Sequence, residues 1–154
     1  MNCSVLGDRE FCQTSVLEEV IKKDNILSFH DKYERGGKGM LSLMRKIPAE
    51  LSCDDEKQIK QYAVDTFHAL CCEGVCRIDF LMDTEQDEIY VNEINTIPGS
   101  LSCYLWEKSG ISFSKLLDTL ISLSLKRYRL SHNKIRSWDT NLLKTYQKGE
   151  GKLK

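Results

Sequence analysis

Residues 75–95 read VCRIDFLMDTEQDEIYVNEIN and form the most strongly patterned segment of the chain. Apolar side chains occupy every second position from Cys76 to Met82, and a similar alternation returns from Ile89 to Ile94 after a polar turn. Because successive side chains of a strand point to opposite faces, this period of two predicts two strands joined as a β-hairpin.

The remaining face of the predicted hairpin is polar. Arg77 and Asp79 lie two residues apart on the first strand, and Glu93 and Asn95 lie two apart on the second, so each pair shares a face. Two carboxylates and an amide suit Mg²⁺, and an arginine beside them suits a phosphoryl group. The spacing alone fits a surface salt-bridge network equally well, because antiparallel sheets often expose one polar face.

One register of the hairpin places all four polar side chains on the same face. Its opposed pairs are Asp79 with Glu93, Arg77 with Asn95, and Leu81 with Val91. A slip of one residue would send the two polar pairs to opposite faces. This register requires a hairpin loop with an odd number of residues, about three to five.

The pattern continues on both sides of the hairpin. We expect a strand at residues 2–6, an extended segment at 15–21 that could pair with it, and a glycine-rich loop at 31–39. Ser52, followed three residues later by Asp55, predicts the N-cap of a helix that runs to about Cys72.

A last clear helix is expected from about Ser112 to Tyr128. Its inward face is predicted to hold Phe113, Leu116, Leu117, Leu120, Ile121 and Leu125, with Leu123 flanking. Together these elements indicate the α+β class, with an antiparallel sheet and flanking helices.

The composition is that of one ordinary domain of 154 residues, 41% hydrophobic and 29% charged. No long apolar run indicates a membrane span or a secretory signal, so we expect a cytoplasmic location. Seven cysteines without a CxxC pair favour reduced, mostly buried thiols over a disulfide framework or a zinc site. Residues 129–154 carry seven basic and two acidic side chains. This basic extension lacks clustered or aromatic-interleaved charges, and we expect neither nucleic acid nor membrane as a partner.

Three segments together resemble the C-terminal signature of D-alanine–D-alanine ligases, which have the ATP-grasp fold. They are CRIDF at 76–80, IYVNEINTIPG at 89–99 and LWEKSGISF at 105–113. The earlier CSVLG at 3–7 and DKY at 31–33 occur in the family's order, so the resemblance covers residues 1–128. It implies the C-terminal portion of an ATP-grasp fold over residues 1–128, followed by the extension at 129–154.

The resemblance implies a role for each site residue. Asp79, Glu93 and Asn95 resemble the ligands of Mg²⁺ (or Mn²⁺), with Glu93 bridging two ions. Arg77 resembles the clamp on the transferred phosphoryl group, and the backbone N–H of Gly99 the oxyanion donor. Lys32 and Tyr33 resemble residues of the loop that closes over the phosphates. Ser100 or Ser102 resembles the serine that binds the carboxylate of the second substrate. ATP is the implied co-substrate, and a homodimer is possible.

Two departures from the family limit what the resemblance implies. The segment between Pro98-Gly99 and Leu105 is short, which leaves the second substrate open. The family's N-terminal domain and much of its ATP site precede the matched segment, so we expect the chain to need that missing part and to be inactive alone. A related ATP-grasp ligase for other amino acids, and a non-catalytic remnant or interaction module, remain alternatives.

Overall fold

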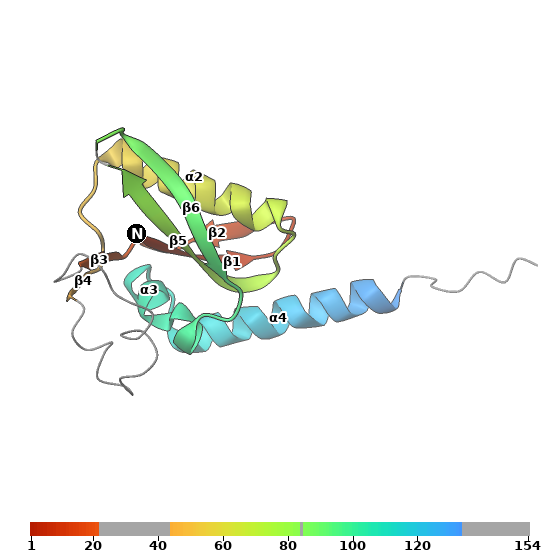
Figure 1. The fold of residues 1–154 in the computed structure, drawn as a ribbon. Helices are drawn as coiled ribbons and strands as arrows, with labels where there is room; N and C mark the ends of the chain where they lie inside the picture. Colours follow the sequence, from red (N-terminus) through yellow and green to blue (C-terminus); the bar gives the residue numbers. More distant parts are fainter. Residues whose placement is uncertain (22–43, 84, 134–154) are drawn as a thin grey trace, which may run out of the picture. The chain divides into compact units, whose positions relative to one another are not determined.

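The computed structural model describes residues 1–21, 44–83 and 85–133 (Figure 1). The chain divides into two compact units, Met1–Ser124 and Leu125–Lys154. The strands are β1 (Asn2–Gly7), β2 (Cys12–Thr14), β3 (Glu19–Ile21), β4 (Met44–Lys46), β5 (Gly74–Asp83) and β6 (Glu88–Asn95). The helices are α2 (Cys53–Ala69), the short 3₁₀ helix η2 (Gly99–Ser102), α3 (Cys103–Lys108) and α4 (Phe113–His132), the last of which starts in the first unit and ends in the second.

Four strands form an antiparallel sheet in the order β2-β1-β5-β6, and β3 pairs with β4 separately. The predicted class, an antiparallel sheet with flanking helices, is confirmed, as is the strand at residues 2–6. The predicted pairing of residues 15–21 with that strand is confirmed in part, since Glu18 and Asn2 form an antiparallel bridge with backbone hydrogen bonds in both directions, at 2.8 and 2.9 Å. The continuous ladder on this side of β1 is formed by β2 instead, and it ends where the Ser15 hydroxyl accepts the backbone N–H of Ser4 at 3.0 Å.

The hairpin of β5 and β6 is present with its predicted polar pairs. Asp79 lies opposite Glu93 and Arg77 opposite Asn95. The register then shifts between Asp79 and Phe80, which pairs with Val91, so Asn92 has no opposite residue and forms a β-bulge.

The bulge overturns the rest of the predicted register. Leu81 lies opposite Tyr90 rather than Val91, and four positions, 84–87, separate the paired Asp83 and Glu88. The predicted odd loop is therefore wrong, because one extra residue in β6 changes the parity of the loop without moving the polar pairs.

Helix α2 begins where the sequence predicts. The Ser52 hydroxyl accepts the backbone N–H of Asp55 at 3.1 Å, which satisfies one of the free amides of the first turn. The helix ends at Ala69, slightly before the predicted Cys72, and Cys71 follows with a left-handed φ of 53°.

The two faces of the four-stranded sheet differ in chemistry. The face against α2, here called the α2 face, is apolar: Cys3, Val5, Cys76, Ile78 and Phe80 pack there with Ile59, Ala63 and Phe67 of the helix. The opposite face, here called the α3 face, carries Ser4, Leu6, Val75, Arg77 and Asp79 by strand alternation. At its apolar end Leu6 and Val75 pack against Trp106 of α3 and Leu116 of α4.

Helix α4 is longer than predicted and uses a narrower contact face. Leu116 is buried, and Leu120 and Leu123 are partly buried in the same cluster. Four residues predicted to face inward are instead exposed: Phe113, Leu117, Ile121 and Leu125. They form an adjacent i, i+4 row, and helical periodicity alone does not separate the two rows. None of the helices in the described ranges has the length and apolarity needed to cross a membrane.

All seven cysteines are free thiols, as predicted, but only Cys3 and Cys76 are buried. Burial raises the pKa of each of these two thiols to about 12, so both stay protonated at neutral pH. The expectation of mostly buried thiols is wrong, because Cys53 and Cys71 lie exposed near the two ends of α2.

Candidate metal and phosphate site

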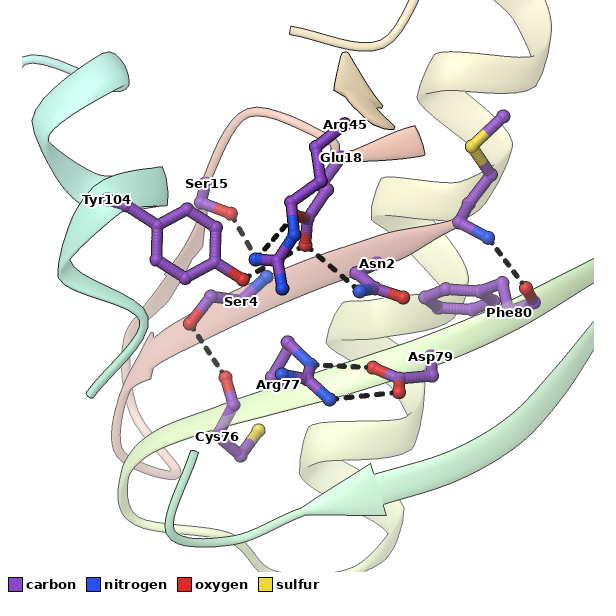
Figure 2. Close-up of polar contacts among 11 residues, drawn as sticks. Asn2, Ser4, Ser15, Glu18, Arg45, Cys76, Arg77, Asp79, Phe80 and Tyr104 are labelled. Carbon is purple, nitrogen blue, oxygen red and sulfur yellow. Dashed lines mark hydrogen bonds and ion pairs between the residues drawn. The ribbon is translucent and has the colours of Figure 1, made fainter. Parts of the chain in front are cut away.

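Arg77 and Asp79 form the centre of the polar face of β5. Arg77 Nε donates to Asp79 Oδ1 at 2.8 Å and Nη2 donates to Oδ2 at 3.0 Å, a bidentate pair (Figure 2). This hydrogen bonding raises the pKa of Arg77 against the opposing effect of burial. The guanidinium therefore stays a cation and is held in one orientation on β5 by Asp79.

Glu93 faces this pair across the hairpin. Its side chain is exposed, while the side chain of Asp79 keeps 18% of its surface exposed. Directly opposed side chains in an antiparallel pair have Cβ atoms about 4.5–5.5 Å apart, which brings the two carboxylates within reach of one cation. The bulge at Asn92 lies immediately beside Glu93, and bulges commonly re-aim side chains next to functional sites.

Asn95 completes the group of four and is incompletely bonded. Its Nδ2 is buried, and among the described residues it has no hydrogen-bond partner. Buried polar atoms are nearly always bonded, so the amide is poised for a partner outside the described protein atoms. If the amide is turned over, Oδ1 takes the same place as an oxygen donor.

The donor set fits a hard divalent cation. Asp79, Glu93 and Asn95 offer carboxylate and amide oxygens, which Mg²⁺ prefers, and Mg²⁺ usually takes its other ligands from water and phosphate. Within the ranges 1–21, 44–83 and 85–133 no group of three or more His, Cys, Asp or Glu side chains forms a metal cluster. A site with two carboxylates and one amide suits a cation that takes its remaining ligands from water and a nucleotide's phosphates.

The short segment after Pro98 follows an unusual backbone path. Ser100, Leu101 and Ser102 all have left-handed φ values, between 51° and 54°. Such values are costly for residues other than glycine and are concentrated at functional sites. Gly99, just before them, has nothing within 4 Å of the position that a Cβ would occupy, so the space beside its backbone is open.

The two serines of this segment differ in accessibility. Ser100 is exposed, whereas Ser102 is fully buried, and its hydroxyl bonds to no described residue. Lys32 and Tyr33 lie outside the described residues.

Three polar residues near the site were not found from the sequence: Glu18, Arg45 and Tyr104. Glu18 is fully buried and accepts hydrogen bonds from Asn2 and from the Tyr104 hydroxyl. The only sequence signal for it was a carboxylate directly after the apolar pair Val16-Leu17. Its partners lie as many as 86 residues away in the chain, and such contacts leave no local pattern.

Comparison with known proteins places the hairpin in a family. The model described as "D-ala D-ala ligase C-terminus" matches residues 1–122, which include the whole candidate site. The chain belongs to the D-alanine–D-alanine ligase family. A D-alanine–D-alanine ligase from Thermosipho melanesiensis is 45% identical over 144 residues. The match covers 94% of this chain but 38% of that relative, so the chain spans well under half the length of the ligases it matches.

Solved ligases have the same fold over the matched region. The D-alanine–D-alanine ligase from Coxiella burnetii is 29% identical, with a TM-score of 0.67 over 95% of this chain and 35% of its own. A D-Ala:D-Ser ligase from Enterococcus faecalis is also 29% identical, with a TM-score of 0.58 over 79% of this chain and 35% of its own. These neighbours bear out the prediction that the α+β fold is the C-terminal portion of an ATP-grasp ligase.

Proposed function

We propose that this chain supplies the metal- and phosphate-binding part of an ATP-dependent ligase that joins two D-alanines for peptidoglycan precursor synthesis in the cytoplasm. The observation that carries the proposal is the hairpin register, which pairs Asp79 with Glu93 and Arg77 with Asn95 on one face. This face lies inside the region that matches the ligase family.

In this proposal Asp79, Glu93 and Asn95 would hold Mg²⁺ (or Mn²⁺), with Glu93 the residue shared between two ions as the family resemblance implies. A metal bound there would supply positive charge against the phosphates. Arg77, held in orientation by Asp79, places a second positive charge against the transferred phosphoryl group. Both positive charges would stabilise the negative charge that develops during phosphoryl transfer.

The proposed reaction has two steps. A carboxylate oxygen of the first D-alanine attacks the γ-phosphorus of ATP, and the bond to ADP breaks, leaving an acyl phosphate. The amine of the second D-alanine then attacks the acyl carbonyl, the bond to phosphate breaks, and the amine loses a proton. In the second step the proposed role of the Gly99 N–H is to donate to the oxyanion, and the open space at the position of a Gly99 Cβ, with nothing within 4 Å, supports a close approach of substrate to this backbone.

Three other residues have proposed roles in binding. Lys32 and Tyr33 cover the phosphates from a closing loop. Of the two candidate serines, Ser100 is accessible for the second substrate and Ser102 is not. The rest of the ligase, with the adenine-binding residues, is the further partner that this proposal requires, and a homodimer remains a prediction.

A chimera tests the proposal. This chain replaces the matching C-terminal region of the Thermosipho melanesiensis ligase, and dipeptide and ADP are measured with ATP, Mg²⁺ and D-alanine. The chimera is expected to make D-alanyl-D-alanine, and the 154-residue chain alone is expected to make none. A folded chimera without ATP-dependent product would contradict the proposal and favour a non-catalytic module. Dipeptide made by the chain alone would refute its dependence on the missing part.

The same assay addresses a related activity. The similarity to a D-Ala:D-Ser ligase and the short segment at residues 100–104 support a ligase for another second amino acid. D-Serine is therefore supplied in competition with D-alanine. Preferential formation of the mixed dipeptide would assign the chain to that alternative.

A further inference from the structure

A buried carboxylate next to the candidate site organises a second polar group. Glu18 Oε2 accepts hydrogen bonds from Asn2 Nδ2 at 3.0 Å and from the Tyr104 hydroxyl at 2.9 Å. Arg45 Nη1 lies 3.2 Å from Glu18 Oε1, an ion pair without hydrogen-bond alignment. Figure 2 shows the three side chains converging on Glu18 from β1, β4 and α3.

The burial of Glu18 requires this compensation. Its side chain is 1% exposed, and a buried carboxylate without a cation is strongly unfavourable. The neighbouring Tyr104 has its pKa raised to about 12 by burial and by the charge of Glu18, so the phenol stays protonated and donates to Glu18. The hydrogen bond between Tyr104 and Glu18 therefore holds both side chains in position.

Arg45 is held by both residues but is not buried with them. Its guanidinium carbon lies 5.7 Å from the centroid of the Tyr104 ring, within cation–π range. Its side chain keeps 30% of its surface exposed. A guanidinium has five N–H donors, and the contact with Glu18 involves one nitrogen, so the group can bind a second anion.

This group borders the face that carries Arg77. Asn2, bonded to Glu18, lies opposite Asp79 in the β1–β5 pair. The charges of both Arg77 and Arg45 act on Tyr104 and partly offset the rise of its pKa. Tyr104 directly follows the segment 99–103 that contains the left-handed residues, so Arg45, whose guanidinium lies over the Tyr104 ring, is next to the end of that segment.

We propose that Arg45, oriented by Glu18 and Tyr104, binds the carboxylate of the second amino-acid substrate. This inference rests on the proposed ligase function, in which two anions must be accommodated together. Arg77 is paired with Asp79 and assigned to the phosphoryl group. The free carboxylate of the amine substrate needs a separate cation, and Arg45 is the partly exposed cation fixed beside the short segment. Glu18 is a positioning residue here, since it is too deeply buried to touch substrate.

A competition between two amine substrates tests this. In the chimera, D-alanine and D-alaninamide compete for the same acyl phosphate, and the ratio of D-alanyl-D-alanine to D-alanyl-D-alaninamide is measured. The amide lacks the carboxylate that Arg45 is proposed to bind, so the unaltered chimera favours D-alanine. Arg45→Met is expected to lower the ratio about tenfold or more, since a charged hydrogen-bond partner is lost. The KM for ATP is expected to stay unchanged.

Two further variants distinguish a role of Arg45 in substrate binding from a role in stabilising the fold. Arg45→Lys keeps a cation against Glu18 and is expected to fold, with a ratio between those of the unaltered and Met forms. Lys46→Met removes the neighbouring cation of β4, which pairs with Glu50 at 3.1 Å, and is expected to leave the ratio unchanged.

The outcomes distinguish the two proposals. Active Arg45→Met and Arg45→Lys chimeras with the unaltered product ratio would overturn the role of Arg45 and leave the ligase function standing. An unaltered chimera that folds but makes no dipeptide would overturn the ligase function itself.

Discussion

The two faces of the four-stranded sheet are built from the same strands, but one is packed as apolar core and the other carries polar and charged side chains. On the α2 face, Cys76, Ile78 and Phe80 of β5 are buried against α2. On the α3 face, Arg77 and Asp79 of the same strand carry a charged pair that is still partly exposed. Alternation along one strand therefore puts the residues that stabilise the fold and the residues of the candidate site on opposite faces. Substitutions on the α2 face should lower stability, and substitutions on the α3 face should lower activity.

Substitution of Glu93 on the polar face should impair turnover more than any other change considered. Glu93→Gln in the chimera is expected to lower turnover by about 10³-fold or more, because the substitution removes one of the two negative charges that would hold the metal, and without the metal the phosphate charge is uncompensated. The side chain is exposed, so the unfolding midpoint should hardly change. Rates of dipeptide formation and thermal melts measure both.

The matched control is Glu85→Gln in the exposed turn of the same hairpin, where the same chemical change should leave turnover intact. Equal rates for the two variants would show that the polar face has no special role.

The next effect is on the apolar side. Phe67→Ala removes a fully buried ring from α2 and is expected to lower the free energy of unfolding by about 3–5 kcal/mol. Urea denaturation of the 154-residue chain measures it. Leu70→Ala, one turn further and 56% exposed, is the control, with an expected change of about 0.5 kcal/mol or less. Similar losses for both would mean that α2 is not packed as described.

A smaller loss of stability is expected from a buried polar residue on the α3 face. Ser4 lies on the α3 face, where its Oγ donates to the Cys76 carbonyl at 2.8 Å and accepts the indole N–H of Trp106 at 3.1 Å. Ser4→Ala leaves these buried partners unsatisfied and is expected to cost about 1–3 kcal/mol of stability. Ser114→Ala, exposed on α4, should be nearly neutral. A neutral Ser4→Ala would show that Trp106 is not anchored through this hydroxyl.

The sequence predicted the elements whose causes are local. The capped start of α2 and the hairpin both follow from patterns within about twenty residues, and the polar pairs follow from strand parity. The bulge at Asn92 was not predicted, because one extra residue in β6 changes the length of the hairpin loop but leaves the polar pairs of Arg77 and Asp79 in place.

The other errors have long-range causes. The exposed row on α4 was misassigned because periodicity shows that a helix is amphipathic but not which of two adjacent rows contacts the sheet. The group around Glu18 was missed because its members come from three separate elements. Contacts of this kind arise from tertiary packing, which a single sequence does not encode in any local window.

We propose that Asp79, Glu93 and Asn95 hold a divalent cation on the α3 face. A crystal structure of the chimera grown with Mn²⁺ and a nucleotide, with anomalous scattering recorded to locate the metal, tests this assignment. An anomalous peak is expected within about 2.1–2.3 Å of oxygen atoms of both Asp79 and Glu93, distances expected for a hard divalent cation. Bound nucleotide with manganese held elsewhere, and none against these two carboxylates, would contradict it.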